Sequence, residues 1–123
     1  MKWNSLVPKV LVENMDTSLS FYLEGLGFSV AFSRKDPLFV YLSLDDTQLM
    51  LEETGVRPHT DGIDMKLKVT DVAAVRERLL KMNYPINRDI DDYTYETSEG
   101  FITQRELWVN DPDGVLLRIV QEI

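Results

Sequence analysis

The sequence contains no cysteine and only one histidine among its 123 residues. Without thiols there are no disulfide bonds, no thiolate metal sites and no cysteine nucleophile. The one histidine, His59, lies in a segment with glycine and proline, where a solvated loop residue is the favoured interpretation. No stretch approaches the roughly 18 consecutive apolar residues of a membrane span, and residues 1–8 have no basic region followed by a long apolar one, as a secretory signal would. We therefore expect a cytoplasmic protein with no membrane partner.

Positive charge is also scarce, since 13 basic residues stand against 21 acidic ones and give a formal charge of −8. An acidic chain disfavours nucleic acid as a partner and favours cationic or neutral ligands. The hydrophobic share of 44% and the charged share of 28% are ordinary for a soluble globular domain. No phosphate-binding loop, nucleophile elbow or Ser/His/Asp set is present. The sequence therefore gives no support to a nucleophilic enzyme.

The apolar pattern predicts the same order of elements twice. The first half predicts a strand at 6–12, a helix that Asn14 or Asp16 caps and that ends at Gly25 or Gly27, and strands at 28–33, 38–44 and 48–53. The second half predicts a strand at 63–69, a helix that Thr70 or Asp71 caps, strands at 85–90, 103–110 and 115–121, and a polar loop at 91–100. We therefore predict an α+β fold of two βαβββ modules, which form a curved mixed sheet with the helices outside. Residues 1–123 make one domain, with module 1 at 1–55, a linker at 56–61 and module 2 at 62–123.

The end of the chain predicts a hairpin, because residues 105–122 read RELWVNDPDGVLLRIVQE. Pro112 presets φ at the second place of the turn, and Gly114 supplies a positive φ. The flanking runs of leucine, valine, isoleucine and tryptophan are typical of strands. We expect two antiparallel strands that close the domain.

Four motifs, taken in this order, resemble a known family. Residues 12–22 read VENMDTSLSFY, 25–28 read GLGF, 49–52 read LMLE and 111–118 read DPDGVLLR. The combination resembles the vicinal oxygen chelate superfamily, which contains glyoxalase I, extradiol dioxygenases, fosfomycin-resistance enzymes and bleomycin-resistance proteins. The resemblance implies paired βαβββ modules and, in the enzymes, a divalent metal ion held by four strands.

The positions that match the family's metal ligands are Val7, Glu52, Asp64 and Arg118. Val7 has no donor atom, and Arg118 has a permanent positive charge that would repel a cation. We therefore expect no metal cofactor and no catalytic residue. Two interpretations of Arg118 stay open: it takes the place of the metal between the carboxylates of Glu52 and Asp64, or strand alternation turns it outward to solvent.

The remaining resemblance is to bleomycin-resistance proteins, in which a pair like Arg105-Glu106 precedes the DPDG turn. Members of that branch are acidic dimers, so the resemblance implies a homodimer. Besides Glu52, Asp64 and Arg118, the predicted ligand-binding residues are Phe32, Phe39, Tyr41, Tyr93, Tyr95, Phe101, Arg105 and Trp108. For Tyr41 and Trp108, packing in the core is the favoured alternative, whereas the predicted loop at 91–100 holds two tyrosines among polar residues where a core role is hard to justify.

The function that follows is metal-independent binding of a small molecule, in which a cleft sequesters an antibiotic or a similar cationic or aromatic ligand. Two alternatives stay open. One is a glyoxalase-like, metal-dependent isomerase or dioxygenase, and the other is a ligand-binding module of unknown role.

Overall fold

The structure is a computed structural model that describes all residues, 1–123, and it contains two four-stranded sheets. Module 1 consists of β1 (Lys9–Val12), α1 (Met15–Leu19), its continuation η1 (Ser20–Gly25), β2 (Ser29–Arg34), β3 (Phe39–Leu44) and β4 (Thr47–Glu53). Module 2 consists of β5 (Asp64–Lys68), α2 (Val72–Lys81), β6 (Arg88–Thr97), β7 (Gly100–Asn110) and β8 (Leu116–Glu122). The strand orders β1-β4-β3-β2 and β5-β8-β7-β6 are equivalent, and in each sheet the first strand runs parallel to the last. The two predicted βαβββ modules and the closing hairpin of β7 and β8 are thus confirmed.

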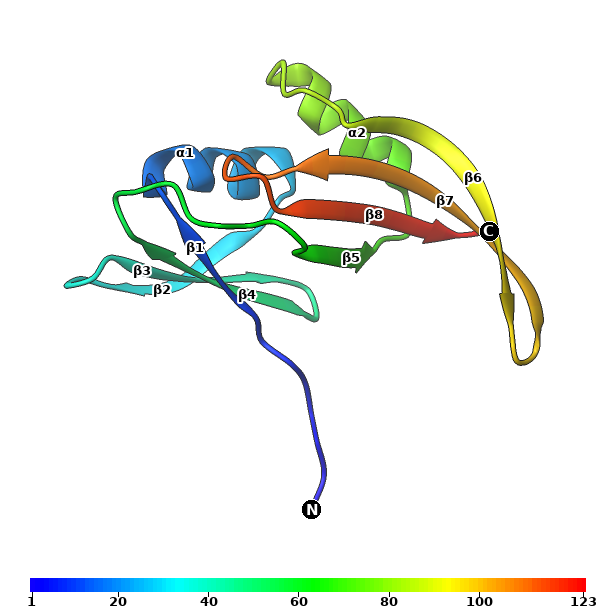
Figure 1. The fold of residues 1–123 in the computed structure, drawn as a ribbon, viewed down its shortest axis with the longest axis horizontal. Helices are drawn as coiled ribbons and strands as arrows, with labels where there is room; N and C mark the ends of the chain where they lie inside the picture. The colour runs from blue at the N-terminus through cyan, green and yellow to red at the C-terminus, as the bar shows by residue number, and fades with distance from the viewer.

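Strand alternation gives each sheet one face toward the helices and one face without them. Residues such as Leu42 and Leu51 in the first sheet, and Leu107 and Ile119 in the second, belong to one buried core that also contains residues of both helical segments. Figure 1 shows α1 above the first sheet and α2 above the second. The opposite faces are called here the helix-free faces. No helix of the structure has the length and apolar composition that crossing a bilayer requires.

Two buried aspartates of the DPDG turn connect module 2 to module 1. The Tyr22 hydroxyl donates to Asp111 Oδ2 at 2.8 Å, and the backbone N–H of Glu13 donates to Asp113 Oδ1 at 3.2 Å. Asp111 Oδ1 also accepts from the N–H groups of Asp113 and Val115, both at 2.9 Å. A buried carboxylate is tolerated only when such donors replace water. The turn therefore fixes the position of one module relative to the other.

Two glycines allow close approach at the same junction. Gly114 has φ 95°, and a Cβ atom there would lie 3.0 Å from Thr60 Oγ1. A Cβ atom at Gly25 would lie 3.0 Å from Leu79 Cδ2, so the absence of a side chain lets η1 pack directly against α2. Gly25 therefore permits packing between the two modules, and Gly114 permits packing of the turn against the linker.

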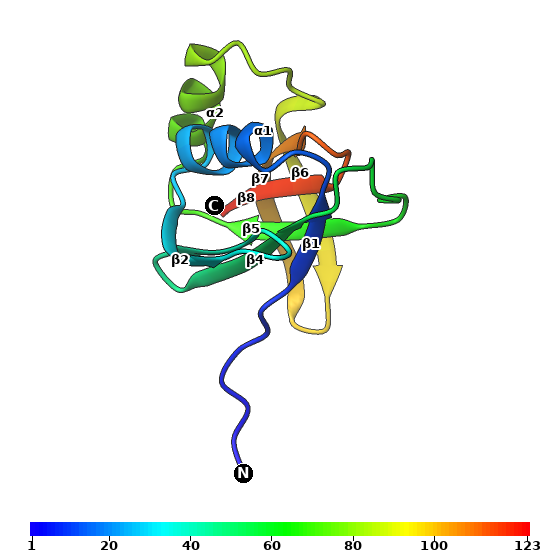
Figure 2. The ribbon, with the colours of Figure 1, turned by 90° about the vertical axis from the view of Figure 1, so that its left-hand side faces the viewer.

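Residues 1–8 have no regular structure, so the predicted strand at 6–12 begins only at Lys9. This segment extends away from the body of the molecule in both views (Figure 1, Figure 2). Trp3 is 89% exposed and Leu6 is 88% exposed. The N-terminal segment thus presents apolar side chains that its own chain does not cover.

The predicted loop at 91–100 is wrong, because these residues belong to a long hairpin. β6 continues to Thr97, β7 begins at Gly100, and the two strands pair over most of their length. The aspartates and threonines suggested a loop, but they alternate with Tyr93 and Tyr95 at the period of a half-exposed strand. For this segment, the alternation of side chains predicts the structure better than the polar composition does.

We predict that Tyr22→Phe lowers the free energy of unfolding by about 1–3 kcal/mol at about pH 7, because a buried carboxylate loses a donor. Burial already raises the pKa of Asp111, with the hydrogen bond from Tyr22 opposing that rise. The folded pKa therefore lies above the unfolded one, so the cost of the ionised carboxylate is present at neutral pH and disappears as the pH falls below both values. Losing the hydroxyl raises the folded pKa further, so the destabilisation is larger at about pH 7 than at about pH 4.5.

Urea unfolding at both pH values measures this difference. Tyr41→Phe is the matched control, because the Tyr41 hydroxyl bonds only to the exposed Gln48 at 2.8 Å. An equal loss of stability in the two variants, or a Tyr22→Phe effect that does not change with pH, would contradict the assignment.

Candidate functional site

A row of three aromatic rings lies on the helix-free face of the second sheet. The rings of Tyr93 and Tyr95 are 6.4 Å apart with an interplanar angle of 26°. The rings of Tyr93 and Trp108 are 6.1 Å apart at 18°. Nearly parallel rings on a partly exposed sheet face offer flat surfaces on which a planar ligand group can stack.

Glu106 forms hydrogen bonds with two of these residues, and its side chain has no exposed surface. The Tyr95 hydroxyl donates to Oε2 at 2.6 Å, and Trp108 Nε1 donates to Oε1 at 2.8 Å. The hydrogen bond to Glu106 is the main reason why the pKa of Tyr95 is raised. Both carboxylate oxygens are engaged and buried, so Glu106 positions the rings and is not available to a ligand.

Three cations surround the rings. Arg88 lies 4.9 Å from the Trp108 ring centroid and donates to the Tyr93 hydroxyl at 3.2 Å. Arg118 lies 5.9 Å from the same ring, and Lys66 Nζ lies 5.9 Å from the Tyr95 ring. The register across the sheet explains the arrangement, because Lys66 pairs with Arg118, Arg118 with Trp108, and Trp108 with Arg88. The four side chains therefore form one transverse row.

The predicted position of Arg118 between Glu52 and Asp64 is only partly found. Arg118 Nε lies 3.3 Å from Asp64 Oδ1, and its Nη1 lies 3.6 Å from Glu106 Oε1. Glu52 lies on the other sheet and pairs with Lys9 at 3.3 Å, so the prediction that Arg118 reaches Glu52 is wrong. The second carboxylate partner of Arg118 is Glu106 of β7. Trp108 and Arg118 are register partners, and Glu106 lies two residues from Trp108 on the same face.

Three other predicted aromatic residues gather on the helix-free face of the first sheet. Phe32 stacks on Tyr41 with centroids 4.9 Å apart and lies 6.1 Å from Phe39. Arg34 lies 4.4 Å from the Phe39 centroid. No hydrogen bond or ion pair joins this cluster to the ring row of the second sheet. Within one chain the two aromatic groups are therefore separate.

Phe101 and Arg105 do not join the ring row. Phe101 pairs with Glu96 in register and therefore lies on the face of the hairpin opposite to Tyr95. Arg105 Nε donates to Asp92 Oδ1 at 2.9 Å on the same face of the hairpin as Phe101. The Asp92 hydrogen bond raises the pKa of Arg105, and the Arg105 hydrogen bond lowers the pKa of Asp92. Arg105 thus stabilises the long hairpin.

Sequence reasoning missed Glu106, Lys66 and Arg88 as members of the site, and also Gln104, whose side-chain oxygen accepts a hydrogen bond from Lys66 Nζ at 3.3 Å. Glu106 was noted only as part of a motif, because a charged residue is expected at the surface. A signal existed, since positions 104, 106 and 108 alternate with buried apolar residues at 107 and 109. Alternation at period two places the polar set on one face.

The four positions that match the family's metal ligands do not fit a divalent cation. Val7 offers no donor atom, and Arg118 already forms ion pairs with two carboxylates. Nowhere in the chain do three or more His, Asp or Glu side chains gather closely enough to hold a metal ion. The chemistry of this donor set is that of an ion-pair network.

Two cavities lie near the modules' junction. The first, of about 610 Å³, lies between the sheets and is called here the inter-sheet cleft; Leu6, Pro8, Gln48, Leu49, Lys66, Lys68 and Leu117 are among the residues that line it. Its volume falls in the range of small-molecule sites. Lys66 lines this cleft and also belongs to the transverse row.

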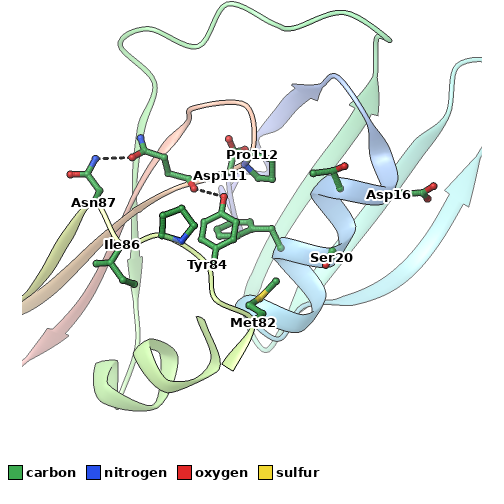
Figure 3. Close-up of a pocket in the computed structure, with 12 residues that line it drawn as sticks. Asp16, Ser20, Met82, Tyr84, Ile86, Asn87, Asp111 and Pro112 are labelled. Carbon is green, nitrogen blue, oxygen red and sulfur yellow. Dashed lines mark hydrogen bonds between the residues drawn. The ribbon is translucent and has the colours of Figure 1, made fainter. Parts of the chain in front are cut away.

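The second cavity is a groove of about 730 Å³ between α1 and the segment before β6. Figure 3 shows Tyr84, Ile86 and Asn87 on one side and Asp16 and Ser20 on the other. The Tyr84 hydroxyl donates to the carbonyl of Asn110 at 2.6 Å, and Asn87 donates to the Asn110 side chain at 2.7 Å. Because these polar groups bond to each other, the groove offers a ligand fewer free partners than the ring row does.

Residues 4–119 match the model of the Glyoxalase/Bleomycin resistance protein/Dioxygenase superfamily, so the chain belongs to that superfamily. Among curated proteins, none matches the sequence.

Solved structures share the fold over nearly the whole chain. A virulence protein from Salmonella typhimurium is 20% identical, with 100% of each chain covered and a TM-score of 0.72. A bleomycin resistance determinant encoded on transposon Tn5 is 23% identical over 97% of this chain and 98% of its own, with a TM-score of 0.67. A lactoylglutathione lyase from Agrobacterium tumefaciens is 12% identical over 98% and 95%, with a TM-score of 0.67. These identities establish a common fold.

We predict that Glu106→Gln lowers the pKa of Tyr95 toward the ordinary value of about 10, because the carboxylate that favours the protonated phenol is lost. The unfolding free energy should fall by about 1–3 kcal/mol, since Arg118 and the ring donors lose a buried charged acceptor. NMR titration of ring-labelled tyrosine checks the pKa. Tyr22 is the internal control, since burial and Asp111 keep its pKa raised. An unchanged Tyr95 titration would show that Glu106 does not hold the hydroxyl.

Proposed function

We propose that this protein binds a planar aromatic small molecule, without a metal ion, on the helix-free face of the second sheet. The observation that carries the proposal is the stacked row of Tyr93, Tyr95 and Trp108, fixed by the buried carboxylate of Glu106. Side chains that hydrogen bonds already hold lose little conformational freedom when a ligand arrives, so more of the stacking energy contributes to affinity. The three rings are partly exposed and do not belong to the buried core, so core packing does not explain their ordered positions.

The role that fits such a site is sequestration, in which the protein removes a compound from solution by binding it. One structural relative is a bleomycin resistance determinant, which makes bleomycin the first ligand to test. The poor fit of the metal positions argues against the alternative of a glyoxalase-like, metal-dependent enzyme, because Arg118 occupies the place of an acidic ligand.

The protein also presents apolar surface suited to a second copy of itself. All six residues of β2 are exposed, and on the helix-free face of the first sheet Leu11 is 41% and Phe32 is 48% exposed. The N-terminal segment adds the uncovered side chains of Trp3 and Leu6. We propose a homodimer in which these surfaces are covered and the first sheet of one chain completes the ligand site of the other. We also propose a cytoplasmic location, which the sequence predicts independently of the dimer.

Ligand binding is tested through the two tryptophan indole N–H signals in a ¹H–¹⁵N NMR spectrum. The neutral probe 2-naphthalenemethanol should shift the signal of Trp108 more than that of Trp3, which does not belong to the ring row; bleomycin is titrated in the same way. Tyr93→Ala should weaken binding of the shifting probe about three- to tenfold, since a lost aromatic stack is worth about 0.5–1.5 kcal/mol. Phe101→Ala, on the opposite face of the hairpin, should have no effect.

Equal shifts of both indoles, or no shift with either probe at millimolar concentration, would refute binding at the ring row. Copurification of about one divalent ion per chain would instead favour the metal-dependent enzyme.

The dimer is tested by analytical ultracentrifugation, which should give about 28 kDa, twice the 14.2 kDa of one chain. Phe32→Asp should shift the protein to monomer, because a charge in an apolar interface is not compensated. Val56→Asp, which changes a 66% exposed valine in the linker, is the matched control and should leave the dimer intact. A monomer of the unaltered chain at high micromolar concentration would refute the dimer.

A further inference from the structure

We infer that the ligand of the ring row is a planar aromatic anion, such as an aromatic carboxylate or sulfonate, whose charged group binds to Lys66. This inference rests on the proposed function and specifies the ligand's charge. The chain as a whole is acidic at −8, but short-range contacts rather than net charge decide what binds at a site.

Arg118 forms ion pairs with both Asp64 and Glu106. Arg118 lies 3.3 Å from Asp64 and 3.6 Å from Glu106, and the latter is also held by Tyr95 and Trp108. A cationic ligand would therefore have to compete with Arg118 for both of them. Glu106 has no exposed surface, and the 47% exposed side chain of Asp64 is engaged by Arg118.

The cations at the two ends of the row have no carboxylate partner. Lys66 Nζ donates only to the neutral side chain of Gln104, at 3.3 Å. Arg88 donates only to the neutral hydroxyl of Tyr93, at 3.2 Å. An anion placed beside the rings gains a charge-assisted hydrogen bond from these groups, whereas a cation is repelled by both.

Two further acids and one further cation lie on this face. By register, Asp91 lies opposite Glu106, Glu122 lies opposite Gln104, and Lys68 lies opposite Val120. The Asp91 carboxylate accepts the backbone N–H of Asp92 at 2.8 Å. Glu122 lies at the end of β8, and Lys68 adds a further positive charge without an ion pair.

Lys66 is the group placed to hold the anion because it lies where the ring row meets the inter-sheet cleft. It lines that cleft of about 610 Å³ and is also 5.9 Å from the Tyr95 ring. A ligand whose rings lie against the tyrosines can therefore place its charged end at Lys66 without losing the stack. Arg88, at the far end, adds to the positive potential.

Three probes with the same ring system but different charge test the inference by isothermal titration calorimetry of the full chain. They are 2-naphthoate, neutral 2-naphthalenemethanol and cationic 2-naphthylmethylammonium. We expect 2-naphthoate to bind at least about tenfold more tightly than the neutral probe, which is the scale of one charge-assisted hydrogen bond, and the cation to bind most weakly. Higher salt should weaken binding of 2-naphthoate and leave the neutral probe unchanged.

Lys66→Met should remove the preference for 2-naphthoate over the neutral probe. Arg88→Met, a second variant at an exposed position, should reduce the preference in part. Lys81→Met removes the same charge at the end of α2 and should have no effect; circular dichroism confirms that each variant is folded.

Equal affinity for all three probes, or tighter binding of the cation, would overturn the inference and leave the proposed aromatic site standing. A preference for 2-naphthoate that survives in Lys66→Met would overturn the assignment of the anion to Lys66. Failure of all three probes to bind would overturn the proposed function together with the inference.

Discussion

The hydrogen bond between Tyr22 and Asp111 is the contact on which the arrangement of the molecule depends most. It joins the helix of module 1 to the turn between the last two strands of module 2, at 2.8 Å and out of contact with water. Without that hydroxyl, the carboxylate would be buried with backbone donors on one oxygen only, which is costly. Because β7 ends and β8 begins at this turn, the same contact sets where Glu106, Trp108 and Arg118 lie relative to module 1.

From this fixed turn, strand alternation determines the site. Leu107 and Val109 face the core, so Glu106 and Trp108 must face the other way. Register then places Arg118 beside Trp108 and Arg88 on its other side. A shift of one residue in either strand would bury the charged side chains and expose the apolar ones. The burial of Leu107 and Val109 in the core thus determines, indirectly, that Trp108 lies on the helix-free face.

The parts of the fold that the sequence predicted well are those that depend on local chemistry. The proline and the glycine of the turn at 111–114, the caps at Asn14 and Asp71, and the repeated strand-helix pattern each specify a structure within a few residues. The long hairpin was missed because its aspartates and threonines resemble a loop, and only pairing with β7 makes them a strand. The partners of Arg118 were missed for a similar reason, since cross-strand neighbours depend on register, which one sequence does not reveal.

The charge of the chain illustrates the same distinction between global and local properties. A net charge of −8 predicts a cationic ligand. However, acidic residues such as Asp45 and Asp46 lie in a turn, and Asp92 lies on the face of the long hairpin opposite the rings. Salt screens exposed charges beyond about 8–10 Å, so the potential at the rings is set by the residues of the transverse row. There Asp64 and Glu106 are paired with Arg118, and the cations at the two ends of the row, Lys66 and Arg88, have no carboxylate partner. Net charge therefore bears on solubility and on distant encounters, while the paired and unpaired groups beside Trp108 govern which ligand stays bound.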